Sequence, residues 1–204
     1  YKKGSFLDSM KDQAQHIKEL YFAGGEPLMI PEHYNILQFM VDEGYAQNCC
    51  IRYNSNGTDI PEKLLKLWKH FNEVTFNFSI DAYGDKNDYI RYPSKWNTIA
   101  GNLRMLDSTL PNIRINIAAA AQLLNIAYLD ELAQWKQEQN FTKVNLPPFG
   151  GGVISTHLVY LPNYLNIRVL PIELKKFTKE RIINFVDRQK FNYEFEKSHM
   201  GKMR

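Results

Sequence analysis

Cysteine is almost missing from this chain of 204 residues, which contains only Cys49 and Cys50. Neighbouring residues rarely form a disulfide, because the bond needs Cα atoms roughly 5.5 Å apart. We therefore expect two reduced, buried thiols on a strand. A chain of this size buries about 70% of its unfolded surface, so its core can stabilise the fold without cross-links.

Long apolar runs and charge stripes are also missing. No stretch approaches the roughly 18 apolar residues that span a membrane. The 25 basic and 22 acidic residues are interspersed, which argues against nucleic-acid binding. The chain starts at Tyr1 without an initiator methionine or the pattern of a signal peptide. We therefore expect a fragment or processed chain of a cytoplasmic protein, with neither nucleic acid nor a membrane as partner.

Strand-like runs alternate with helical patterns along the chain. The expected strands cover residues 19–23, 50–56, 74–81, 113–121 and 142–147, and a last helix is expected over 172–188. This alternation predicts βαβ units and a parallel sheet. No linker divides the sequence, so we expect one α/β domain over residues 1–204, with 189–204 as a C-terminal extension.

Polar and apolar side chains alternate on three of the expected strands. Fully buried parallel strands normally read as continuous apolar runs, so this pattern needs an explanation. Either one face of the sheet lies in water, or the strands form a barrel whose polar lumen holds a ligand. The intervening helices favour the barrel, where buried polar groups require partners. The polar positions are Arg52, Asn54 and Asn56, then Thr75, Asn77, Ser79 and Asp81, and then Arg114 and Asn116.

The segment 21–28, Tyr-Phe-Ala-Gly-Gly-Glu-Pro-Leu, carries the most specific motif. Its two glycines permit a sharp turn and close approach of a ligand, and its proline ends the strand. Ligand sites in βα barrels lie at the carboxyl ends of the strands. Carboxylates and neutral hydrogen-bonding groups collect there and suit an ammonium group and ribose hydroxyls. These residues are Glu26, Asn54, Asn56, Ser79 and Asp81.

Gly24-Gly25-Glu26-Pro27 after an aromatic strand resembles the second-strand motif of the radical S-adenosylmethionine (SAM) superfamily. Ser79-Ile80-Asp81 resembles that family's Ser-Ile-Asp-Gly, with Ala82 in place of the glycine. The resemblance implies a partial (βα)6 TIM-like barrel with parallel strands, outer helices and a missing first strand. Leu161-Pro162 and the last helix look like the SPASM or twitch branch, whose members often modify peptides, so a peptide or protein is a candidate substrate.

The resemblance also implies cofactors, namely SAM and a [4Fe–4S] cluster. Gly24, Gly25 and Glu26 would hold the SAM amino group. Ser79 and Asp81 would face its ribose and carboxylate region. Arg91 would pair with the SAM carboxylate, as guanidinium groups do bidentately, although an exposed loop arginine is an equal alternative. Asn116, together with Arg114 and residues 144–148, would line the adenine or substrate region.

The cluster ligands of that family are absent from the sequence. It contains no Cys-x3-Cys-x2-Cys, and two adjacent cysteines cannot replace it, because a cluster needs thiolates on separate irons. We therefore identify no metal ligand and no catalytic residue, and expect the chain alone to be inactive. Three functions stay open: part of a radical SAM enzyme that cleaves SAM to a 5′-deoxyadenosyl radical, another βα-barrel lyase or isomerase using Glu26 or Asp81 as acid or base, or a non-catalytic barrel that binds a polar ligand.

Overall fold

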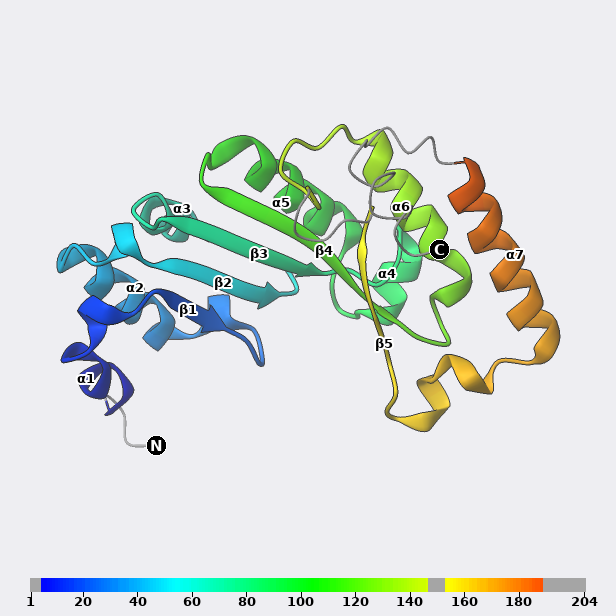
Figure 1. The fold of residues 1–204 in the computed structure, drawn as a ribbon, viewed down its shortest axis with the longest axis horizontal. Coiled ribbons are helices and arrows are strands. Elements are labelled where there is room, and N and C mark those ends of the chain that lie inside the picture. The colour runs from blue at the N-terminus through cyan, green and yellow to red at the C-terminus, as the bar shows by residue number, and fades with distance from the viewer. Residues whose placement is uncertain (1–4, 147–152, 189–204) are drawn as a thin grey trace, which may run out of the picture.

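The computed structural model describes residues 5–146 and 153–188. Five parallel strands form one sheet in the order β1-β2-β3-β4-β5 (Figure 1). The strands are β1 (Glu19–Phe22), β2 (Cys50–Ser55), β3 (Glu73–Ser79), β4 (Ile113–Ala121) and β5 (Ser155–Leu158). The α-helices are α1 (Ser5–Lys11), α2 (Pro31–Asp42), α3 (Glu62–Trp68), α4 (Asp85–Ile90), α5 (Trp96–Thr109), α6 (Leu129–Glu138) and α7 (Ile172–Arg188). The expected α/β fold, a partial barrel of parallel strands with outer helices, is confirmed.

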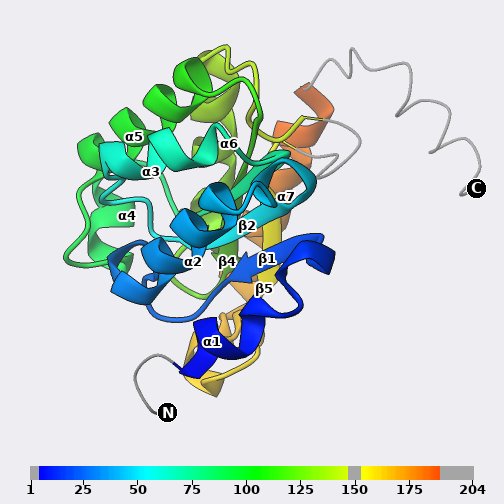
Figure 2. The same cartoon turned by 90° about the vertical axis from the view of Figure 1, so that its left-hand side faces the viewer.

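One face of the sheet is apolar and is covered by helices. Figure 2 shows α2, α3 and α5 together on one side of the strands. The strand residues on this face alternate with the polar ones, as period-two geometry requires. They pack against helix residues spaced three or four apart, the pattern of an amphipathic helix. The fully buried members of this core include Tyr53, Phe76 and Phe78 from the strands and Leu37, Trp68 and Leu103 from the helices.

The strand register brings polar residues of three strands into one row. Asn54 of β2 is paired with Asn77 of β3, and Asn77 is paired with Asn116 of β4. Because neighbouring strands lie about 4.8 Å apart, amide side chains in such a row reach one another. The register therefore builds a row of asparagines across the open face.

The prediction of a strand over residues 142–147 is wrong. Lys143 O and Asn145 N do bond with Ile115, but only a single bridge between Ile115 and Val144 forms. Asn145 then turns to a φ of 50°, and its Oδ1 accepts the N–H of Ile117. The Asn145 side chain thus accepts the Ile117 N–H, which a backbone carbonyl would have accepted if residues 142–147 had continued as a strand. Residues 147 and 148 of the expected adenine or substrate region lie outside the described residues, as does the expected extension over 189–204.

The two cysteines lie at the beginning of β2. Cys49 is buried and Cys50 is half-buried, and both are free thiols. Burial raises the pKa of Cys49 to about 11, so this thiol stays protonated at neutral pH. In the described part of the chain, no helix is long and apolar enough to cross a membrane.

Candidate ligand site at the carboxyl ends of the strands

The Gly-Gly-Glu-Pro turn connects the end of β1 to the end of β2 through Glu26. Gly24 and Gly25 have φ values of 89° and 59°, in the region that favours glycine. Oε1 of Glu26 accepts hydrogen bonds from Ser55 Oγ (2.7 Å) and the backbone N–H of Leu28 (3.4 Å). Its Oε2 accepts the backbone N–H of Asn56 (2.9 Å). A carboxylate has about four lone-pair sites, so Oε2 keeps capacity for one further donor, such as a ligand ammonium group.

Asp81 and Arg91 form an ion pair beyond the end of β3. Arg91 Nε lies 2.8 Å from Asp81 Oδ2, and Asp81 is buried while the arginine side chain is 27% exposed. Asp81 Oδ1 accepts the backbone N–H of Ala120 (2.7 Å). The Arg91 side chain therefore has a fixed position at the sheet, and its Nη groups supply further donors.

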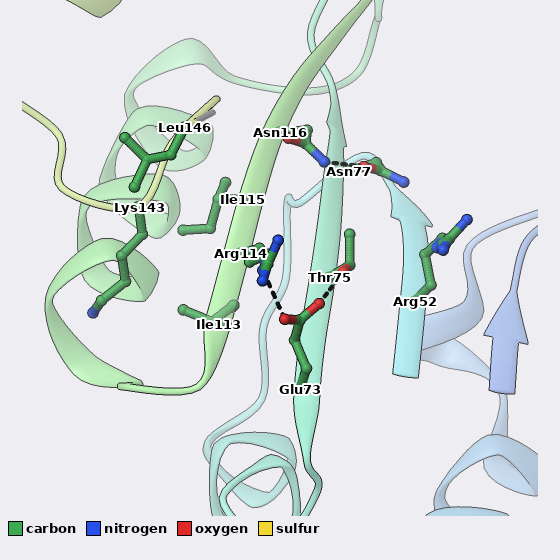
Figure 3. A pocket seen from close by; sticks show the side chains of 10 residues that line it. All are labelled: Arg52, Glu73, Thr75, Asn77, Ile113, Arg114, Ile115, Asn116, Lys143 and Leu146. Atoms are coloured by element: carbon green, nitrogen blue, oxygen red, sulfur yellow. Dashed lines mark hydrogen bonds and ion pairs between the residues drawn. The ribbon is translucent and has the colours of Figure 1, made fainter. Parts of the chain in front are cut away.

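A ladder of side-chain hydrogen bonds crosses the polar face of the sheet. Asn116 Nδ2 donates to Asn77 Oδ1 (2.9 Å), Asn77 Nδ2 donates to Asn54 Oδ1 (2.8 Å), and Asn54 Nδ2 donates to Tyr21 Oη (2.6 Å). Figure 3 shows the contact between Asn116 and Asn77. Each amide satisfies the next, so this face is ordered by its own side chains.

The amino-terminal half of the polar face holds a cavity of about 510 Å³ (Figure 3). Its two arginines are paired across neighbouring strands: Arg114 Nε lies 2.6 Å from Glu73 Oε2, and Arg52 Nη2 lies 2.8 Å from Glu19 Oε1, while Lys143 Nζ donates to the backbone O of Asp107. Thr75 Oγ1 also donates to Glu73 Oε1 (3.4 Å). These ion pairs neutralise the two arginines, so Lys143 is the cavity's one basic residue without an ion pair among the described residues.

A cavity of about 320 Å³ occupies the carboxyl-terminal half of the same face. The structure brings four of the predicted residues into its lining: Asn54, Ser79, Arg91 and Asn116. Ser155 and His157 also line it, and the sequence analysis missed both because it missed β5. Asn56 and Asp81 instead line an adjacent cavity, which Arg91 shares. The turn residues Gly24, Gly25, Glu26 and Pro27 line neither cavity, and Glu26 reaches the site only through Ser55 and Asn56.

The two cofactors implied by the resemblance differ in their fit. Serine, amide and guanidinium groups around the 320 Å³ cavity suit the hydroxyl and carboxylate groups of SAM. A [4Fe–4S] cluster does not fit the described residues. Cys49 and Cys50 lie at the opposite end of β2 from Glu26, and no three His, Cys, Asp or Glu residues within 5–146 and 153–188 are placed to hold a metal ion.

Fold and site together define an α/β partial barrel with a polar cavity at the carboxyl ends of its strands. No protein-family model and no curated protein sequence matches the chain. Among solved structures, it is similar to SuiB from Streptococcus suis bound to S-adenosylmethionine, with a TM-score of 0.57 and 14% identity over 91% of this chain and 41% of that one. A second SuiB structure matches with the same TM-score and identity over 40% of its chain. The likeness establishes a shared fold, and this chain spans about two fifths of the matched chains' length.

Proposed function

We propose that this chain forms the SAM-binding part of a radical SAM enzyme that modifies a peptide. The observation that carries the proposal is the Gly-Gly-Glu-Pro turn, whose carboxylate is held at the carboxyl ends of β1 and β2 by Ser55 Oγ and the Asn56 N–H. The fold shared with a SAM-bound protein supports it. The peptide substrate rests on the resemblance of the sequence to the SPASM or twitch branch.

The chain's own residues would bind and orient SAM. Glu26 would accept a hydrogen bond from the SAM ammonium group through the free capacity of Oε2. Arg91, fixed against Asp81, would pair with the SAM carboxylate. Ser79, Asn54 and Asn116 would offer hydrogen bonds to the nucleoside in the 320 Å³ cavity. Given one electron from a reduced [4Fe–4S] cluster, bound SAM would release methionine and supply the 5′-deoxyadenosyl radical that takes a hydrogen atom from the substrate; we assign no cluster ligand among the described residues.

An acid–base lyase or isomerase has less support from the same geometry. Glu26 already accepts three hydrogen bonds from the protein. Asp81 is engaged at both oxygens, by Ala120 and by Arg91. A general base needs a lone pair within reach of the proton it removes, and these contacts occupy both oxygens of Asp81 and leave Glu26 a single open position on Oε2.

SAM binding by the chain tests the proposal. We expect saturable binding near the millimolar range in isothermal titration calorimetry. Glu26→Gln should weaken it about tenfold, because a neutral amide replaces a charge-assisted acceptor. Glu43→Gln, an exposed position at the end of α2, serves as the matched control. Equal affinity of the two variants would refute the assigned role of Glu26, and no SAM binding by the wild type would refute the proposed function.

Anaerobic reconstitution with iron and sulfide tests the assignment of the cluster. We expect no [4Fe–4S] absorption spectrum from this chain alone, because its two adjacent cysteines cannot ligate separate irons. A stable [4Fe–4S] spectrum would show that the chain does hold cluster ligands.

A further inference from the structure

The adjacent cavity, which Asn56, Asp81 and Arg91 line, has a volume of about 610 Å³. It lies where the carboxyl ends of the central strands meet the segment between α4 and α5. This volume is within the range of roughly 300–1,000 Å³ that is usual for small-molecule sites. Ser94, Lys95 and Thr98 line it from the α4–α5 segment and the first turn of α5. Gln122, the residue that directly follows β4, also lines the cavity.

Two buried polar groups in this cavity have no partner in the protein. Ser94 is 8% exposed and Gln122 is 7% exposed, and neither Ser94 Oγ nor Gln122 Oε1 makes a hydrogen bond within the described residues. A buried polar group without a hydrogen-bond partner destabilises the folded chain. These two groups come from elements far apart in the sequence and line the same cavity, so a ligand that bonds to both would remove both penalties.

The charge of the cavity favours an oxyanion. Arg91 and Lys95 are its basic residues, and Asp81 is its acidic one. Asp81 is already neutralised by Arg91 and by the N–H of Ala120. No carboxylate of the described ranges forms an ion pair with Lys95, whose side chain is exposed to the cavity opening.

The amino terminus of helix α5 contributes less to anion binding than these side chains do. Its first N–H, that of Trp96, donates to Asp88 Oδ1 (2.5 Å), so the protein itself supplies a carboxylate there. We therefore place the oxyanion on Ser94 and Lys95 and not on the helix terminus.

We propose that this cavity binds a second ligand, distinct from SAM, through a carboxylate or phosphate group. Ser94 Oγ donates to the oxyanion and Lys95 pairs with it. Gln122 Oε1 accepts from an N–H or O–H group elsewhere on the ligand. Arg91 lines both this cavity and the 320 Å³ cavity, so the two ligands would lie on either side of one guanidinium group. The binding groups stand on this geometry alone and do not depend on SAM chemistry.

Titrations of the isotope-labelled chain with inorganic phosphate and with acetate, each at constant ionic strength, test this site. We expect saturable shifts of the Ser94, Lys95 and Thr98 amide resonances in heteronuclear NMR spectra. Lys95→Gln and Ser94→Ala should each weaken binding about tenfold, since each removes a contact to a charged group. Lys69→Gln, an exposed lysine at the end of α3, is the matched control and should bind as the wild type does.

The outcomes distinguish a phosphate site from a carboxylate site. They also distinguish failure of this proposal from failure of the proposed SAM-binding function. Saturation by phosphate alone identifies a phosphate site, and saturation by acetate alone identifies a carboxylate site. Shifts that do not saturate, or that are equal in Lys95→Gln and the wild type, overturn the proposal; Lys95 is exposed, so its variant decides even where Ser94→Ala does not fold. SAM binding should be unchanged in Ser94→Ala, and a chain that binds phosphate but not SAM would refute the proposed function alone.

Discussion

Acid should destabilise the fold through His33, a buried residue of α2. Its Nε2 lies 2.7 Å from Tyr53 Oη, which also accepts the indole N–H of Trp68 (3.0 Å). His33 is 2% exposed, and its Nδ1 has no partner within the described residues. Burial, reinforced by the nearby charge of Lys63, lowers the pKa of His33 from 6.5 to about 4. The neutral imidazole is therefore the form that the folded core accepts.

The direction and size of the effect follow from proton linkage. Between pH 6.5 and about pH 4 the unfolded chain binds a proton at His33 and the folded chain does not. Stability therefore falls as the pH drops through this window, and the contribution of His33 is constant above and below it. At 1.36 kcal/mol per pKa unit, a difference between 6.5 and about 4 corresponds to about 3 kcal/mol.

Urea unfolding at a series of pH values between 4 and 7 measures this contribution. We compare the wild type with His33→Phe, which keeps a ring against Phe22, Tyr34 and Tyr53 but cannot titrate. His33→Phe should cost about 1–3 kcal/mol at pH 7, because the Tyr53 hydroxyl loses its acceptor. Its pH dependence should be flatter than that of the wild type by about 3 kcal/mol over the whole window. Equal slopes would refute the reasoning, and His70→Gln, at an exposed position, should keep the wild-type slope.

Two further substitutions test the packing and the ion pair beside the site. Gly57→Ala should destabilise the fold by about 2–4 kcal/mol in urea unfolding, because a Cβ there would lie 2.1 Å from the Phe78 ring at a φ of +66°; Gly44→Ala, at +73° with no atom within 4 Å, should cost only about 1 kcal/mol, and equal losses would contradict the steric argument. Asp81→Asn should cost about 2–3 kcal/mol in thermal unfolding, since it leaves Arg91 without its buried partner; an unchanged midpoint would show that the pair contributes nothing to stability.

Strand patterns predicted most of the sheet because its core strands are apolar on one face. Four of the five expected strands are confirmed to within two residues at each end. In the fifth expected strand, 142–147, Val144 is buried and forms a bridge with Ile115, yet Asn145 ends that pairing with its positive φ and its side-chain bond to Ile117. β5, Ser-Thr-His-Leu, is short, polar and largely exposed, so it lacks the alternation that identifies a strand.

The site was less predictable, because its groups are positioned by long-range contacts. Asn125 donates to both Asp81 O and Ala120 O and so connects the ends of β3 and β4. Arg91 lies ten residues beyond Asp81 in sequence, and only the fold shows that the two pair. Spacing along one strand predicts which side chains share a face of the sheet. It does not predict which distant residue accepts a hydrogen bond from a given donor.

The location of ligand binding follows from which polar groups the protein leaves unsatisfied. The row of asparagines bonds within itself, and both arginines in the amino-terminal half of the polar face are neutralised by ion pairs between neighbouring strands. The polar strands therefore need no ligand for their stability, which removes the main cost of a polar sheet face. At the carboxyl ends, unused capacity remains in Oε2 of Glu26 and in the unpaired groups of Ser94 and Gln122, all of which adjoin the proposed sites. A ligand gains most free energy where the protein has not already paired its own groups, so we expect binding at this end of the sheet.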